Sequence, residues 1–106
     1  MKKTSSNYTP KCLEFSKFFK GRQGVTTHQI EYEGEHCFFG TAYVDGHEFV
    51  CVDQMKEKEY MVYINNPVEG DERQWVFGYY KTFRKALRKM SSIVDKRKYP
   101  KPIEIW

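Results

Sequence analysis

Histidine and cysteine, the side chains that most often bind zinc in proteins, gather in the middle of this sequence. Three of each occur, and four of the six lie close together: His36, Cys37, His47 and Cys51. A structural zinc site needs four ligands within roughly 2.0–2.3 Å of one ion. The dipeptide Asp45-Gly46 predicts a two-residue hairpin turn, in which Cys37 lies on the sheet face opposite to the other three side chains. His36 and His47 are then on the order of 25 Å apart at about 3.3 Å per residue. We therefore expect no metal and no other cofactor.

Nucleophilic and acid–base chemistry fit the sequence no better. Cys51 stands within the apolar run Phe49–Val52, where burial makes a thiol less reactive, and Cys12 lies on the apolar side of a predicted helix. The carboxylates of the middle segment stand beside predicted turns or on a polar strand face, where solvation explains them. Gly21-Arg22-Gln23-Gly24 is not followed by the Lys-Ser/Thr of a phosphate-binding loop. The sequence predicts a protein that is not an enzyme.

Size and composition predict one domain covering residues 1–106, of which we expect residues 1–8 to be flexible. Of the 106 residues, 40% are hydrophobic, which is enough for a core, and no apolar run is long enough to cross or contact a membrane. Met1-Lys2-Lys3 is followed by polar residues rather than by the apolar stretch of a signal peptide. Three cysteines form an odd and sparse set that suits a reducing compartment. We expect a cytoplasmic protein.

The periodicity of the chain predicts an α+β fold. Thr9-Pro10 begins a short N-terminal helix over residues 10–20. From Val25 the pattern changes to period two, and no connection between the strands is long enough for a parallel crossover. We expect an antiparallel meander of about five strands, over residues 27–32, 36–44, 49–52, 60–64 and 74–80.

A longer, basic, amphipathic C-terminal helix is the clearest element. Thr82 is its predicted N-cap, and Tyr99-Pro100 ends it. Its apolar residues keep one face over three turns: Phe83, Ala86, Leu87, Met90, Ile93 and Val94. Lys101–Trp106 is left either as an added edge strand or as a tail packed by its terminal tryptophan.

Charge is sorted along the chain, and this sorting is its strongest functional signal. Residues 1–22 carry six Lys/Arg and one acid. Residues 23–80 carry three Lys/Arg and eleven acids, and residues 81–106 carry nine Lys/Arg and two acids. Cations on the face opposite the apolar stripe predict contact with nucleic-acid phosphates, and Arg84 and Arg88 could read guanine if the helix enters a major groove. The alternatives are a solvated face, or pairing with the acids of residues 31–72. The predicted interface is Lys81, Arg84, Lys85, Arg88, Lys89, Lys96, Arg97 and Lys98.

Aromatic side chains in the segment Gln74–Tyr80 offer a second route to nucleic acid. Strand alternation puts Trp75, Phe77 and Tyr79 on one face, where Trp75 and Tyr79 could stack on unpaired bases if that face is exposed. A central strand buried on both faces is the alternative.

Apolar residues on both faces of several strands raise the alternative function, a protein-binding or inhibitory module. The straight hairpin register places Phe38, Ala42, Phe49 and Cys51 opposite to Ile30, Phe39, Val50 and Val52. Either the sheet curls around its own core, or its second face meets a homodimer partner or a larger protein. The acidic middle segment could imitate nucleic-acid charge towards a basic target. Small aromatic-rich proteins without a catalytic motif are common in mobile elements. By this analogy of composition, the alternative function includes a protein that a mobile element encodes.

Overall fold

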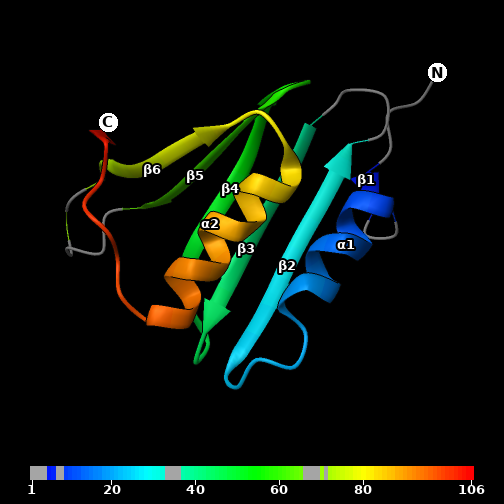
Figure 1. Cartoon of the computed structure of the whole chain (residues 1–106), viewed down its shortest axis with the longest axis horizontal. Coiled ribbons are helices and arrows are strands. Elements are labelled where there is room, and N and C mark those ends of the chain that lie inside the picture. The colour runs from blue at the N-terminus through cyan, green and yellow to red at the C-terminus, as the bar shows by residue number, and fades with distance from the viewer. Residues whose placement is uncertain (1–4, 7–8, 33–36, 66–69, 71) are drawn as a thin grey trace.

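One antiparallel sheet and two helices make up the fold (Figure 1), which we describe from a computed structural model. The structure describes residues 5–6, 9–32, 37–65, 70 and 72–106. Of residues 1–8, which we expect to be flexible, only residues 5–6 are described, and they form a short strand. The rest of this prediction lies outside the described residues. In chain order the elements are β1 (Ser5–Ser6), α1 (Pro10–Phe19), β2 (Val25–Tyr32), β3 (Cys37–Val44), β4 (His47–Lys56), β5 (Glu59–Asn65), β6 (Gln74–Tyr80), α2 (Phe83–Lys96) and β7 (Glu104–Ile105).

The sheet confirms the predicted α+β meander. Its strands lie in sequence order from β1 to β7, and every neighbouring pair is antiparallel. The five long strands are the five that were predicted, and two-residue strands flank them at the two edges. The C-terminal segment takes the edge-strand alternative, because Gln74 and Trp106 exchange both backbone hydrogen bonds at 2.9 Å.

Local sequence explains both helices. Thr9 caps α1 by accepting from the Cys12 N–H at 3.1 Å, and Thr82 caps α2 by accepting from the Lys85 N–H at 3.2 Å. The backbone of Arg97 adopts the left-handed conformation that ends α2, with φ 51°. The six apolar residues predicted for the buried stripe of α2 are all buried.

Both helices pack on the same face of the sheet. The ring of Phe38 on β3 contacts Phe15 of α1 at 5.6 Å and Phe83 of α2 at 4.9 Å between centroids. α1 packs against β2 and β3, and α2 packs against β3 to β6 (Figure 1). Close approach of α1 depends on Gly40, because a Cβ atom there would stand 2.8 Å from the Phe15 ring.

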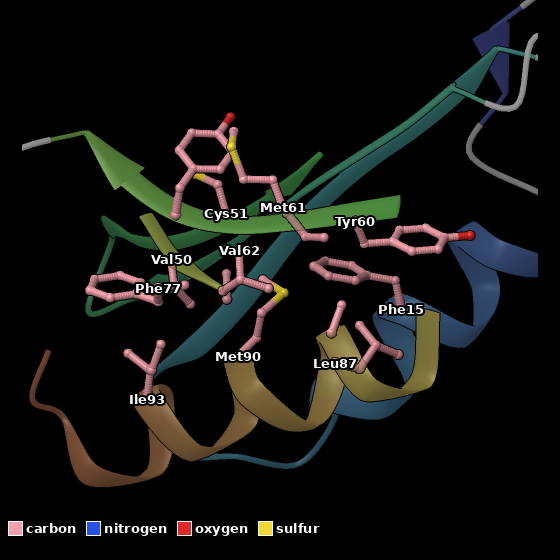
Figure 2. Packing of buried hydrophobic residues seen from close by; sticks show 14 of the residues in the cluster. Phe15, Val50, Cys51, Tyr60, Met61, Val62, Phe77, Leu87, Met90 and Ile93 are labelled. Atoms are coloured by element: carbon pink, nitrogen blue, oxygen red, sulfur yellow. The ribbon is translucent and has the colours of Figure 1, made fainter. Parts of the chain in front are cut away.

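Two β-bulges correct the predicted strand faces. The Asp45-Gly46 turn pairs Val44 with His47 as expected, but the register shifts beyond it, so that Phe49 has no partner. Val50 therefore faces the helices and Cys51 points to the other side (Figure 2). Val52 pairs with Gly40, which lies against Phe15 of α1, so Val52 also faces the helices. The prediction that grouped Cys51 with Phe38 and Ala42 is wrong, because alternation continues from the bulge and not from the turn.

A second bulge lies between β5 and β6, where the extra residue is Phe77. Figure 2 shows Phe77 on the side of the strands that carries Ile93 of α2. Trp75 pairs with Ile64, whereas Tyr79 pairs with Met61. Trp75 and Tyr79 consequently lie on opposite faces, and the prediction of a single aromatic strip is wrong.

The face of the sheet away from the helices is partly enclosed by the sheet itself. Cys51, Met61 and Tyr63 on this face are at most 6% exposed. In Figure 1, β5 and β6 run in a clearly different direction from β2, so the sheet is strongly twisted. The sheet thus curls around the centre of this face, as one of the two alternatives predicted. Ile30, Phe39 and other residues around the centre remain partly exposed.

Candidate nucleic-acid interface

The eight cations predicted from the sequence all lie on α2 or directly beside its ends. Each of them is exposed except Lys89, which is half-buried. For the five cations within α2 this arrangement follows from the helix itself, because its apolar stripe faces the sheet and the remaining positions face outward. The structure divides the eight into residues that are already engaged and residues that are not.

Arg84 and Arg97 are engaged by other parts of the chain. The Arg84 guanidinium contacts Glu14 of α1 through Nη2 at 2.8 Å and through Nε at 3.1 Å. The Arg97 guanidinium donates to the backbone carbonyls of Val94 and Gln23, the latter at 2.7 Å, and so ties the end of α2 to the segment before β2. Both guanidinium groups are therefore held in place by other parts of the chain and have fewer N–H groups left for phosphate than a free arginine has.

The side-chain cationic groups of the other six residues make no ion pair or hydrogen bond within the part of the chain that the structure describes: Lys81, Lys85, Arg88, Lys89, Lys96 and Lys98. We call these six residues the basic face. Among the described acids of residues 31–72, Glu31 pairs with Lys11 and Glu59 pairs with Lys56, and Glu59 also lines a hollow with Lys81. Asp95, the acid within α2, pairs with Arg22. None of these described acids forms an ion pair with a cation of the basic face.

A hollow of about 300 Å³ opens beside the C-terminal half of α2. Its lining combines three lysines, one hydroxyl and a short apolar wall: Lys89, Ser92, Ile93, Lys96, Lys98, Tyr99 and Pro100. Tyr99-Pro100, predicted to end the helix, instead lies in the segment after it, because α2 already ends at Lys96. Ser92 is not among the predicted interface residues. The spacing of Lys89, Ser92 and Lys96 puts them on one side of a helix, a signal that was present in the sequence.

Tyr99, which forms one wall of the hollow, is fixed by aromatic neighbours. Its ring stacks on Phe49 and on Phe77, with centroids 4.7 Å and 5.8 Å away, and meets Trp75 edge-on at 6.3 Å. Burial, with smaller contributions from Cys51 and Glu48, raises the pKa of Tyr99 to about 12. The phenol is therefore neutral at physiological pH and adds no negative charge to the hollow.

The two residues predicted to stack on bases have different surroundings. Trp75 is half-buried and packs on Tyr99. Tyr79 is 36% exposed on the opposite face, where its hydroxyl donates to Glu104 at 3.4 Å. Within the described chain, Trp75 lines no hollow with the six cations, whereas Tyr79 and Lys81 line one hollow together with Lys56, Lys58, Glu59 and Tyr80. The structure therefore brings one stacking candidate beside one phosphate-binding candidate.

The side chains considered for metal or nucleophilic chemistry do not form a site in the described chain. The bulge at Phe49 places Cys37 and Cys51 on the same face, contrary to the prediction, and His47 on the other. His36 lies outside the described residues. Within the described ranges, no three His, Cys, Asp or Glu side chains are grouped so that they could hold a metal ion.

Burial keeps the thiols of Cys12 and Cys51 protonated. It raises the pKa of Cys51, with a smaller increase from Glu48 that opposes the lowering effect of Thr41, and it also raises the pKa of Cys12. Nearby, the Tyr63 hydroxyl donates to Asp53 at 3.1 Å, and burial raises the pKa values of both groups. This polar cluster stabilises the buried centre of the second sheet face and contains no activated nucleophile.

Comparison with known proteins gives no relative from which a role could be transferred: no family model matches the chain, and neither does a curated protein or a solved structure. Among the described residues, no helix is long and apolar enough to cross a membrane. The class that the structure defines is an α+β domain with one antiparallel sheet, two helices on one face and a basic outer helix surface.

Proposed function

We propose that this chain is a non-catalytic binding protein that contacts nucleic-acid phosphates through the basic face of α2. The observation that supports the proposal is the absence of ion pairs at its six cations within the described structure. Lys85 and Lys89 stand at i, i+4, a spacing at which like charges destabilise a helix by a few tenths of a kcal/mol. Phosphates beside them remove this repulsion.

The energetics of such an interface come mainly from counterion release. Each phosphate that a Lys or Arg neutralises frees condensed counterions, so that log K falls against log salt with a slope of about −0.9 per contact on duplex DNA. If four to six of these cations take part, we expect a slope of roughly −3.5 to −5.5. Contacts of this type position the protein without reading sequence.

Sequence readout would rest on Arg88. Of the two arginines expected to contact guanine, Arg84 holds Glu14, and Arg88 remains exposed without a partner in the described chain. A single bidentate arginine discriminates a base by about 1–3 kcal/mol. We therefore expect weak sequence preference.

The test is binding of labelled single- and double-stranded DNA and RNA across a salt series by fluorescence anisotropy. The variant Arg88→Glu with Lys89→Glu should abolish binding at about 100 mM salt while leaving the circular dichroism spectrum unchanged. The matched control is Lys17→Glu with Lys58→Glu, which makes the same charge change at two exposed positions off α2. Equal losses in the two variants would indicate a general charge effect, and no binding by the unmodified protein would refute the proposal.

The uncovered sheet face supports a second candidate function, binding of a basic protein segment. Strand register places the carboxylates of Glu48, Asp53 and Glu104 on this face together with the partly exposed Phe39 and Tyr43. Pairing this face with a second copy would bring acids against acids, which disfavours a homodimer and favours a cationic partner.

A lysine- and arginine-rich peptide provides the test of this second candidate, with calorimetry as the measurement. Tyr43→Ser should lower the affinity for the peptide, and Arg88→Glu should not. A loss of peptide affinity in Arg88→Glu but not in Tyr43→Ser would contradict binding at the sheet face. A dimer in sedimentation experiments would also contradict it.

A further inference from the structure

The hollow beside α2 brings together ammonium groups from two segments of the chain. Lys89, Ser92 and Lys96 come from one side of the helix, at i, i+3 and i+7, and Ile93 lies between them. Lys98 comes from the segment after the helix. The basic face therefore has a concave part at its C-terminal end, whereas Lys81, Lys85 and Arg88 do not line the hollow.

The chain reversal at Arg97 is what returns Lys98 to the hollow. Arg97 has a left-handed backbone, its N–H donates to the Val94 carbonyl at 3.1 Å, and its guanidinium holds the Val94 and Gln23 carbonyls. Beyond it the chain runs back towards β6, as Figure 1 shows. Stacking of Tyr99 on Phe49 fixes the returning segment. The wall that carries Lys98 is thus held in place from both ends.

Electrostatics favour an anion in this hollow. Its lining contains three lysines and no acid. The C-terminal end of a helix carries about −0.5 of an elementary charge, which opposes an anion. Three ammonium groups outweigh this partial charge, and the Arg97 guanidinium already covers the Val94 carbonyl. Asp95 pairs with Arg22 and does not line the hollow.

Size and chemistry narrow the class of anion. About 300 Å³ is at the lower end of the range for small-ligand pockets, and suits one phosphate with its attached sugar rather than a long strand. The Tyr99 ring already stacks on Phe49 and on Phe77, so we expect that no base of a ligand stacks on it. The available donors are ammonium groups and the Ser92 hydroxyl, which match phosphate oxygens.

We propose that the hollow binds a phosphate monoester, either the terminal phosphate of a nucleic-acid strand or that of a free nucleotide. A phosphate monoester carries about −1.5 to −2 charges at pH 7, and an internal phosphodiester carries one. Three lysines therefore discriminate in favour of the monoester. The proposal rests on the proposed function in that it assigns one part of the basic face to the end of a strand.

The experiment compares short oligonucleotides of identical sequence with a 5′-phosphate, a 3′-phosphate or only hydroxyl ends. Fluorescence anisotropy measures their affinity, and a nucleoside 5′-monophosphate is the competitor. We expect one terminal phosphate to raise the affinity about tenfold, since hydrogen bonds to charged groups contribute on this scale. Lys96→Ala with Lys98→Ala should remove this preference. The matched control Lys81→Ala with Lys85→Ala should weaken all oligonucleotides equally and keep the preference.

The outcomes separate this inference from the proposed function. If phosphorylated and hydroxyl-ended strands bind equally and the monophosphate does not compete, the hollow is not a monoester site, and the proposed function stands. If no oligonucleotide binds but labelled nucleoside monophosphate does, and the Lys96→Ala, Lys98→Ala variant loses it, the hollow binds free nucleotides and the proposed function is wrong. If neither class of ligand binds, both are wrong. All four substituted lysines are exposed, so these variants should fold.

Discussion

The ring of Phe49 stacks on the ring of Tyr99, with centroids 4.7 Å apart and planes 20° from parallel. Phe49 is the extra residue of the bulge in β4, and the second ring stacked on Tyr99 belongs to Phe77, the extra residue of the bulge in β6. Two interruptions of strand pairing therefore converge on one tyrosine beyond α2. This contact links the sheet to the wall of the hollow that carries Lys98.

Truncation of this tyrosine should destabilise the fold. Tyr99→Ala removes three aromatic contacts from a half-buried ring, and we expect a loss of about 2–4 kcal/mol in the free energy of unfolding. Tyr99→Phe keeps the ring and should cost under about 1 kcal/mol. Urea denaturation measures both, with Tyr79→Ala as an exposed control. Similar losses for Tyr99→Ala and Tyr79→Ala would show that the stacked contacts contribute little.

The same tyrosine should make stability depend on alkaline pH. The pKa of Tyr99 rises from 10.0 to about 12 on folding, so above pH 10 the unfolded chain releases this proton more readily than the folded protein. The stabilisation is complete below pH 10 and is lost as pH rises towards 12. Tyr99→Phe should reduce this decline and should remove one late-titrating group from the tyrosinate absorbance of the folded protein, in which burial also raises the pKa of Tyr63. An unchanged pH profile in Tyr99→Phe would contradict the assignment.

Local pattern was sufficient to predict the elements but not the faces of two strands. The start of α2, its cap at Thr82 and its buried stripe follow from short-range spacing, which the sequence displays directly, whereas its end at Lys96 is set by the left-handed backbone of Arg97. A bulge depends on what its extra residue packs against, and Phe49 and Phe77 pack on Tyr99, which is distant in sequence. The error in the strand faces follows from this long-range contact.

In the candidate interface, too, local spacing predicts some features, whereas others depend on contacts between residues that are distant in sequence. The outward placement of the five cations within α2, which are Arg84, Lys85, Arg88, Lys89 and Lys96, follows from the helix period. The partners of Arg84 and Arg97 are Glu14 and Gln23, each 70 or more positions away in sequence, and no periodicity reveals them. The hollow was missed because Lys98 reaches it through the chain reversal at Arg97.

Packing of α1 against the sheet gives a further prediction. A methyl group at Gly40 would stand 2.8 Å from the buried Phe15 ring, so Gly40→Ala should lower the free energy of unfolding by about 1–3 kcal/mol. Phe15→Leu should also destabilise alone, by removing ring contacts. In the double variant the smaller side chain makes room for the methyl group, so the two losses should sum to more than the measured total. Strict additivity in urea denaturation would place the strain elsewhere.

Release of Arg84 should strengthen nucleic-acid binding. Glu14→Gln removes the carboxylate that holds Arg84, and should cost under about 1 kcal/mol of stability because the pair is solvent-exposed. If the freed guanidinium joins the basic face, the salt slope should become steeper by about 0.9. Glu57→Gln makes the same charge change at an exposed turn and is the control. Equal gains in the two variants would reflect net charge alone.

Arg97 and Arg88 should respond differently to loss of charge, although both are exposed arginines. Arg97 is committed to the Val94 and Gln23 carbonyls, whereas Arg88 has no such partner in the described chain. Arg88→Gln should therefore reduce the magnitude of the salt slope by about 0.9, and Arg97→Gln should leave it unchanged while lowering stability by about 1 kcal/mol or more. Arg97→Gly separates the two structural roles of this residue, because glycine accepts the positive φ but lacks the guanidinium. A salt slope that falls equally in Arg88→Gln and Arg97→Gln would mean that Arg97 leaves its carbonyls to contact phosphate.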